Sequence, residues 1–132
     1  MEPISEERQR AIYEWRYPEL KGHPKWTLYT SEFDEEYPEA PLTCTITVCW
    51  PMGESPIRWG VDPLYVYHNG VLVPNIQFFV DECVPQLKAE RVTVRFGFAG
   101  DNWWYVDPLD DDENAYGNPD PYAALAEMLE AK

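Results

Sequence analysis

The sequence contains few of the side chains that usually carry catalysis or bind metals. It has two histidines and three cysteines, Cys44, Cys49 and Cys83, without a close CxxC pair. An odd number of cysteines without such pairs is a poor framework for disulfides or for zinc. Cys83 and His68 could form a catalytic pair, but a cysteine on an apolar helix face more often serves packing. We therefore expect a reducing compartment, a protein that is not an enzyme, and no cofactor.

Long apolar runs and the marks of export are missing as well. No window approaches the roughly 18 apolar residues of a membrane span. The first ten residues, MEPISEERQR, lack the basic start and apolar run of a secretory signal. The sequence also has no glycine-rich phosphate loop. We expect a cytoplasmic protein that does not bind membranes.

Uninterrupted helices are disfavoured by the proline content. The chain has 13 prolines among 132 residues, about twice the usual share of ~5%, and they are scattered along its length. A hydrophobic content of 45% is ordinary for a globular protein and argues against disorder. A chain of this length can bury one hydrophobic core. We expect a single domain over residues 1–132 with short elements.

Positive charge is scarce, and the negative charge is concentrated. The formal net charge is −14. Residues 31–41 carry five acidic and no basic side chains, and residues 101–132 carry nine acidic side chains and one lysine, whereas the other segments are nearly neutral. Such a charge opposes contact with nucleic acid or an anionic membrane and favours a basic partner.

Three segments are expected to be helical. Ser5 can cap a helix that Pro18 ends. Residues 75–88 fit either a helix or a strand, because their apolar residues keep helical spacing but Pro85 interrupts it, and we favour a helix. Asp120 can cap a last helix that runs to the C-terminus, with a proline at its first position.

Alternating apolar residues and turn signals predict the strands, with Asn69 and Gly70 as a type I′ turn inside one hairpin. The expected strands lie within residues 25–30, 42–50, 64–73, 91–98 and 103–106. In the fourth of these segments the residues expected to face the core are Val92, Val94, Phe96 and Phe98. The sum is an α+β domain, an antiparallel β-sheet of about five or six strands with short N- and C-terminal helices.

Two acidic loops, expected at 31–41 and 107–120, contain aromatic residues. Carboxylates around exposed rings suit arginine and lysine, through ion pairs and cation–π contacts. Because Trp103 and Trp104 are adjacent, a strand would point them to opposite faces, so that one can be exposed. We expect the two loops to converge on one face of the molecule. The predicted partner-binding residues are Glu35, Glu36, Tyr37, Trp104, Asp110, Asp111, Asp112, Glu113 and Tyr116.

The second acidic segment matches the spacing of a calcium-binding EF-hand loop only in part. Asp110, Asp112 and Asn114 would occupy the first three ligand positions. The position that needs glycine is Ala115, however, and the position that needs a bidentate glutamate is Pro121. We therefore expect no metal site.

The pattern of charge and aromatic residues favours a non-enzymatic protein that binds the basic surface of a partner protein. The partner could be a nuclease or another nucleic-acid-binding factor, which the protein would inhibit in the way that nucleic-acid mimics and immunity proteins inhibit their targets. This analogy rests on charge alone. One alternative is a β-rich module that binds a small molecule or carbohydrate in a pocket lined by Trp59, Trp103 and Tyr65. Another is an assembly protein, such as a virus particle component, that oligomerises through an exposed strand.

Overall fold

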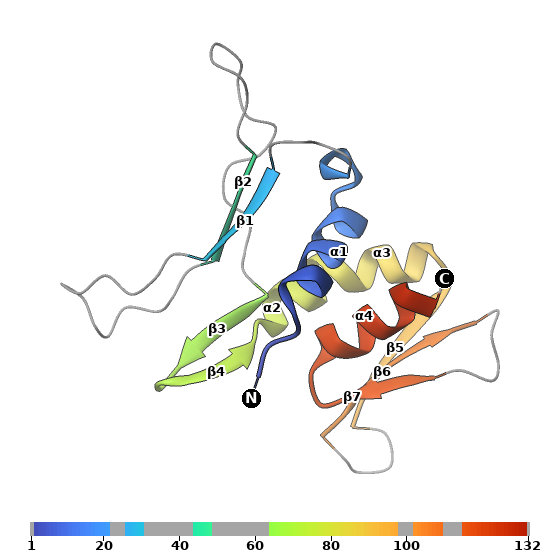
Figure 1. The fold of residues 1–132 in the computed structure, drawn as a ribbon. Coiled ribbons are helices and arrows are strands. Elements are labelled where there is room, and N and C mark those ends of the chain that lie inside the picture. Colours follow the sequence, from blue (N-terminus) through green and yellow to red (C-terminus); the bar gives the residue numbers. More distant parts are fainter. Residues whose placement is uncertain are drawn as a thin grey trace.

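The structure is a computed structural model of the chain (Figure 1). It describes helices and strands of an α+β protein. For two of the strands, at 26–30 and 44–48, the description covers the backbone only. The described residues are 2–21, 26–30, 44–48, 64–97, 102–109 and 115–131.

The strands form small antiparallel sheets. β1 (Trp26–Thr30) pairs with β2 (Cys44–Val48), and β3 (Tyr65–His68) pairs with β4 (Val71–Pro74). A three-stranded sheet has the order β5–β6–β7, with bounds Val92–Phe96, Trp104–Pro108 and Tyr116–Asn118.

The α+β class is confirmed, but the single sheet of five or six strands is not found in the described part of the chain. Every pairing joins neighbouring strands of the sequence. Helical residues 76–89 separate β4 from β5 along the chain. The β3–β4 hairpin therefore stays a separate ribbon instead of extending the larger sheet.

The β3–β4 hairpin turns as the sequence predicts. Asn69 and Gly70 both have positive φ, 52° and 78°. His68 is paired with Val71 on either side of this two-residue loop. Positive φ at both central residues is what a type I′ turn requires, which explains why asparagine and glycine stand there.

The two terminal helices are confirmed together with their caps. α1 (Glu6–Arg16) begins after Ser5, whose Oγ accepts a hydrogen bond from Arg8 N at 3.3 Å, and a 3₁₀ turn, η1 (Pro18–Leu20), follows it. α4 (Pro121–Ala131) begins after Asp120, whose Oδ1 accepts from Tyr122 N at 2.9 Å. Side-chain oxygens thus satisfy backbone N–H groups that a helix start leaves unpaired.

Residues 76–89 are helical, as favoured, and the helix widens just before its proline. α2 (Ile76–Phe78) is followed by one π turn, η2 (Phe79–Cys83), and then by α3 (Val84–Ala89). The Val84 N–H donates to Phe79 O, five residues back. Pro85 has no N–H to donate and its ring would crowd a regular α-helix, so the wider turn lets the helix continue through it.

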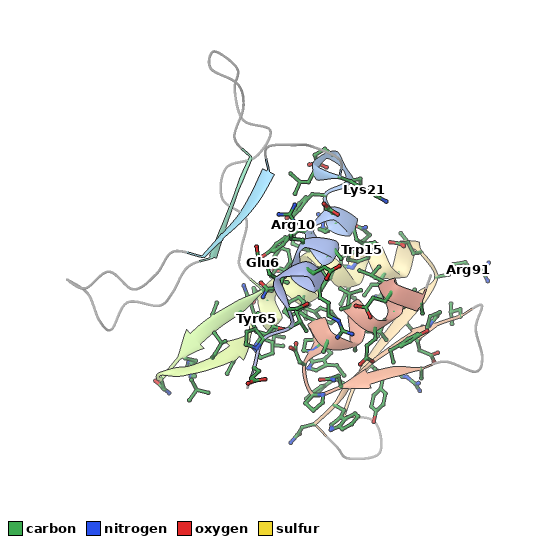
Figure 2. All side chains as sticks on the ribbon, in the orientation of Figure 1. Glu6, Arg10, Trp15, Lys21, Tyr65 and Arg91 are labelled. Carbon is green, nitrogen blue, oxygen red and sulfur yellow. The ribbon has the colours of Figure 1, made fainter. Side chains whose placement is uncertain are left out.

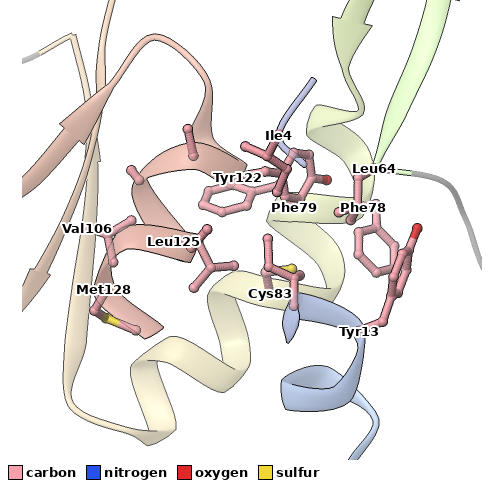
Figure 3. Close-up of a cluster of buried hydrophobic side chains, with 14 of the residues drawn as sticks. Ile4, Tyr13, Leu64, Phe78, Phe79, Cys83, Val106, Tyr122, Leu125 and Met128 are labelled. Carbon is pink, nitrogen blue, oxygen red and sulfur yellow. The ribbon is translucent and has the colours of Figure 1, made fainter. Parts of the chain in front are cut away.

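The hydrophobic core lies where α1, α4 and the helical segment 76–89 meet the three-stranded sheet, whose inner face α4 covers (Figures 1 and 3). Aromatic rings dominate it. Tyr13 of α1 lies 6.2 Å from Phe78, and Phe79 lies 5.5 Å from Tyr122 of α4 in an edge-to-face arrangement, both measured between ring centroids. Edge-to-face pairs add stability beyond the area they bury.

Cys83 belongs to this core. Its side chain is fully buried, and burial raises the pKa of its thiol to about 12. His68 is exposed at the hairpin turn. A thiol that stays protonated and out of reach of solvent is unsuited to nucleophilic chemistry, which fits the packing role.

The alternation expected for residues 91–98 holds only in part. Val92 is buried and Val94 is half-buried, but Phe96 is 55% exposed, contrary to the prediction that it faces the core. Trp104 is the physical reason. Its ring centroid lies 5.3 Å from that of Phe79 and 4.6 Å from that of Phe96. The Trp104 ring therefore fills the core position, and Phe96 packs on the solvent side of that ring. Phe98 lies outside the described residues.

Among the described helices, none combines the length and the apolar character that crossing a membrane requires.

Candidate partner-binding surface

The three-stranded sheet has two faces of different character. Side chains alternate along each strand, and the register Val94↔Val106↔Tyr116 defines the inner face toward α4. The opposite face, called the outer face here, is built from the remaining positions. They are Thr93, Arg95, Trp103, Tyr105, Asp107 and Gly117.

Two aromatic rings lie together on the outer face. Trp103 and Tyr105 stand two residues apart, so both point to the same side of the sheet. Their ring centroids are 6.4 Å apart and their planes differ by 30°, a stacked arrangement. Trp103 is 43% exposed, and Tyr105 is half-buried. The pair forms a partly exposed aromatic surface in which stacking orients the two rings.

Gly117 makes room for these rings. A Cβ at this position would stand 2.6 Å from Tyr105 Cε1 and 3.4 Å from Trp103 Cε3. Since Gly117 is paired directly with Tyr105 across the strands, the Tyr105 ring lies over bare backbone of β7. Glycine is needed here for close approach.

An ion pair crosses the same face. Arg95 Nη2 lies 3.2 Å from Asp107 Oδ2, and Thr93 Oγ1 donates to the Asp107 carbonyl oxygen at 3.2 Å. Both charged side chains are partly exposed, and such surface pairs add little stability. The pair orders the side chains beside Tyr105 and partly neutralises Asp107.

The two predicted site residues that the structure describes, Trp104 and Tyr116, lie on the inner face. Trp104 contacts Phe79, and Tyr116 is half-buried and packs against the core. The exposed member of the tryptophan pair is Trp103, which was not among the predicted site residues. Parity with Val106, the one aliphatic residue of WWYV, could have identified Trp104 as the inward ring.

The other predicted site residues lie outside the described part of the chain. The convergence of the two acidic segments concerns the same residues and stays a prediction. These residues are Glu35, Glu36, Tyr37, Asp110, Asp111, Asp112 and Glu113.

The strand pairing does show where each acidic segment is inserted. The first joins β1 to β2 and the second joins β6 to β7, so each connects two antiparallel neighbours. Within the range 107–120, Asp107 and Pro108 end β6 and Tyr116–Asn118 form β7, while residues 110–114 lie outside the described part of the chain.

One acidic residue of this region is buried. Asp120 is 4% exposed, and its Oδ2 accepts a hydrogen bond from the Tyr65 hydroxyl at 2.5 Å, while that hydroxyl accepts one from Ile4 N at 3.1 Å. Burial raises the pKa of the Asp120 carboxyl, against the opposite effect of the hydrogen bonds from Tyr65 and from the backbone of Tyr122. Asp120 therefore joins the N-terminal segment, β3 and α4, and is not available to a partner.

The described residues do not form the small-ligand pocket that the alternative function predicts. Tyr65 is buried in the core at the base of the β3–β4 hairpin (Figure 2), and Trp103 is exposed on the outer face of another sheet. Trp59 lies outside the described residues.

Within the described ranges, no group of three or more histidine, cysteine, aspartate or glutamate side chains is placed to hold a metal ion. Compared with protein-family models, with curated proteins and with solved structures, the chain gives no significant match.

Proposed function

We propose that the protein binds the basic surface of a partner protein through the outer face and the acidic sequence that joins β6 to β7. The carrying observation is the partly exposed, stacked Trp103–Tyr105 pair at the start of β6, the strand that precedes Asp110, Asp111, Asp112 and Glu113 in the sequence. The rings lie at the start of β6, and the acidic sequence follows the end of β6 and precedes β7.

An arginine of the partner fits this combination best. Its planar guanidinium can stack on an aromatic ring or pair bidentately with a carboxylate, so several arginines of one basic surface could use the rings and the acidic sequence together. Each exposed cation–π contact contributes about 0.5–1 kcal/mol. The ordered ring pair reduces the side-chain entropy that binding would otherwise cost.

Long-range attraction supplies the second contribution. A net charge of −14 speeds the encounter with a basic surface, because opposite fields steer the two proteins together. Carboxylates spaced along a surface can occupy the sites at which a nucleic-acid-binding protein normally binds the phosphates of its nucleic acid. Inhibition of a nuclease or another nucleic-acid-binding factor is the consequence that we propose for such binding.

Affinity capture from a lysate tests the proposal. The wild type is compared with a variant in which Asp110, Asp111 and Asp112 become Asn and Glu113 becomes Gln. We expect a basic partner that the wild type retains and the variant loses. With that partner purified, affinity should fall steeply as salt rises, since exposed charges are screened beyond about 8 Å at physiological ionic strength.

A matched control changes the same number of charges elsewhere. Four glutamates away from the outer face, Glu2, Glu6, Glu7 and Glu127, are replaced by Gln. This variant should keep most of the affinity. Equal loss in both variants would reduce the proposal to an effect of net charge, and binding that is indifferent to salt would refute it.

A second candidate function rests on the same ring pair. Trp103 and Tyr105 could stack against a small molecule or carbohydrate. Such binding would be insensitive to salt and to neutralising residues 110–113, but it would be lost when Trp103 is replaced by Ala. Titrating the purified protein with a panel of glycans, followed by tryptophan fluorescence, separates this function from the first.

A further inference from the structure

One edge of the three-stranded sheet has unpaired backbone groups. Gly97 N donates to Trp103 O at 3.0 Å and Leu109 N donates to Arg91 O at 2.9 Å, which fixes the hydrogen-bonding phase of β5 against β6. In an antiparallel pair, successive residues direct their N–H and C=O groups to opposite sides. Those of Val92, Val94 and Phe96 therefore point away from β6.

Nothing in the described part of the chain pairs with these groups. β5 is the first strand in the order β5–β6–β7, and no backbone hydrogen bond of Val92, Val94 or Phe96 reaches another element on that side. Three donors and three acceptors, in a row, thus lack a strand partner among the described residues; the edge is open at Val94 and Phe96 and narrow at Val92, which is 3% exposed.

As far as the described residues go, the opposite edge of the sheet is protected and the β5 edge is not. β7 has only three residues and is followed by Pro119, which has no N–H to offer. Short edge strands and prolines are the usual means of preventing unwanted strand pairing. β5 has five residues, no proline, and the ring of Phe96 55% exposed at its end. An edge of this kind favours pairing.

Charge argues for a second copy of this chain as the partner strand. Lys88, Arg91 and Arg95 are the only basic residues between 64 and 131, and all three lie on α3, on β5 or at their junction, where Arg91 points outward (Figure 2). They offset Glu90 and Asp107 nearby. The β5 edge is therefore close to neutral within an acidic molecule, so two copies would repel each other only weakly there.

We propose that two copies pair β5 with β5 in an antiparallel manner, around a two-fold axis at Val94, to form one six-stranded sheet. Val94 then faces Val94 of the second copy, and Phe96 faces Val92 of the second copy. The pairing would cover the exposed Phe96 ring with an aliphatic neighbour on the inner face. Cross-strand aromatic and β-branched pairs of this kind are favourable.

The outer face is compatible with the same register. Arg95 would stand opposite Thr93 of the second copy, so no like charges face each other directly. Thr93 is itself paired with Asp107, and strands are about 4.8 Å apart. Arg95 and Asp107 of different copies would thus lie in one row with a small threonine between them, and the long Arg95 side chain could reach toward the Asp107 carboxylate.

The dimer would place both outer faces on the same side of the joined sheet, because the two-fold axis is perpendicular to it. Two Trp103–Tyr105 pairs would then be presented together, with both α4 helices on the other side. This inference does not depend on the proposed function: an isologous dimer could form whatever the outer face binds.

Sedimentation velocity over a concentration series, at low and high salt, tests the pairing. We expect a monomer–dimer equilibrium that strengthens as salt rises, because salt screens the repulsion between two copies of charge −14. Binding of a basic partner should depend on salt in the opposite direction, so the two ideas can fail separately. A monomer under all conditions, or an assembly larger than a dimer, would overturn the inference.

A pair of matched variants locates the interface. Phe96→Lys places a charge at the β5 edge and should abolish the dimer, whereas Val71→Lys changes an equally exposed strand residue, 55% in both cases, and should not. Hydrogen exchange adds a backbone readout that needs no variant. The amides of Val94 and Phe96 should become protected as the protein concentration rises. Equal weakening by both variants, or unchanged exchange at these amides, would contradict the β5 pairing.

Discussion

The two faces of the three-stranded sheet use aromatic residues in different ways. On the inner face, Trp104 fits between Phe79 and Phe96 and helps to close the core. On the outer face, Trp103 stacks on Tyr105 and remains 43% exposed. Two adjacent and chemically identical side chains thus have separate roles, and only the parity of the strand decides which has which.

The largest expected effect breaks the inner face. Phe79→Ala should lower the free energy of unfolding by about 3–5 kcal/mol, because it leaves a cavity between Trp104 and Tyr122. Phe96→Ala is the matched control, since its ring is mostly exposed and its loss should cost about 1 kcal/mol or less. Urea unfolding measures both. Similar losses in the two variants would mean that the division between buried and exposed rings is incorrect.

The next effect is expected where the outer face touches backbone. Gly117→Ala should destabilise the fold by about 1–3 kcal/mol, because the new Cβ would stand 2.6 Å from Tyr105 Cε1. Adding Tyr105→Ala should recover part of this loss by removing the obstructing ring. A double-mutant cycle measured by thermal or urea unfolding gives the coupling. Strictly additive effects would show that the ring does not lie over Gly117.

Replacing each of the two tryptophans in turn by alanine separates their contributions to stability and to binding. Trp103→Ala should change stability by less than about 1 kcal/mol and weaken partner binding by a cation–π contribution of about 0.5–2 kcal/mol. Trp104→Ala should mainly lower stability. Calorimetric binding and urea unfolding of both variants test this. Binding that survives Trp103→Ala intact would remove the ring pair from the proposed site.

A pH-dependent effect, expected to be the smallest, concerns the buried carboxyl beneath the inner face. Burial raises the folded-state pKa of Asp120 above its unfolded value, so the folded state binds the proton more tightly. The wild type should therefore lose stability relative to Asp120→Asn as pH rises from below about 4, the unfolded pKa, through the raised folded pKa. Urea unfolding across this range, with exposed Glu2→Gln as control, provides the measurement.

An increase of stability over the same pH interval would mean that the hydrogen bonds donated by Tyr65 and Tyr122 outweigh burial.

Local signals predicted much of the secondary structure. Ser5 and Asp120 cap helices, and Asn69 with Gly70 makes the hairpin turn, because each acts on its own few neighbours. The division into separate sheets could not be obtained in this way, since it depends on which hairpins meet in space. Neither could the exposure of Phe96, because Trp104 takes the place that alternation alone would give it.

The candidate site was predictable to a smaller extent. Charge clustering and the opposite orientation of Trp103 and Trp104 follow from sequence, but the choice of the exposed ring needed the register with Val106. The contribution of Gly117 left no sequence signal, because a glycine between Tyr116 and Asn118 resembles an ordinary turn residue. The requirement for glycine at position 117 follows only from the packing of the Tyr105 ring over its backbone.

The hydrogen bonds around Tyr65 couple the two ends of the chain. The Tyr65 hydroxyl accepts a hydrogen bond from the Ile4 amide and donates one to Asp120, the residue that caps α4. Arg8 of α1 and Glu130 of α4 also form an ion pair at 2.8 Å. Truncating or tagging the first few residues would therefore loosen the last helix, more than a hundred positions away along the sequence. Fusion partners for this protein are safer when a long spacer separates them from Ile4.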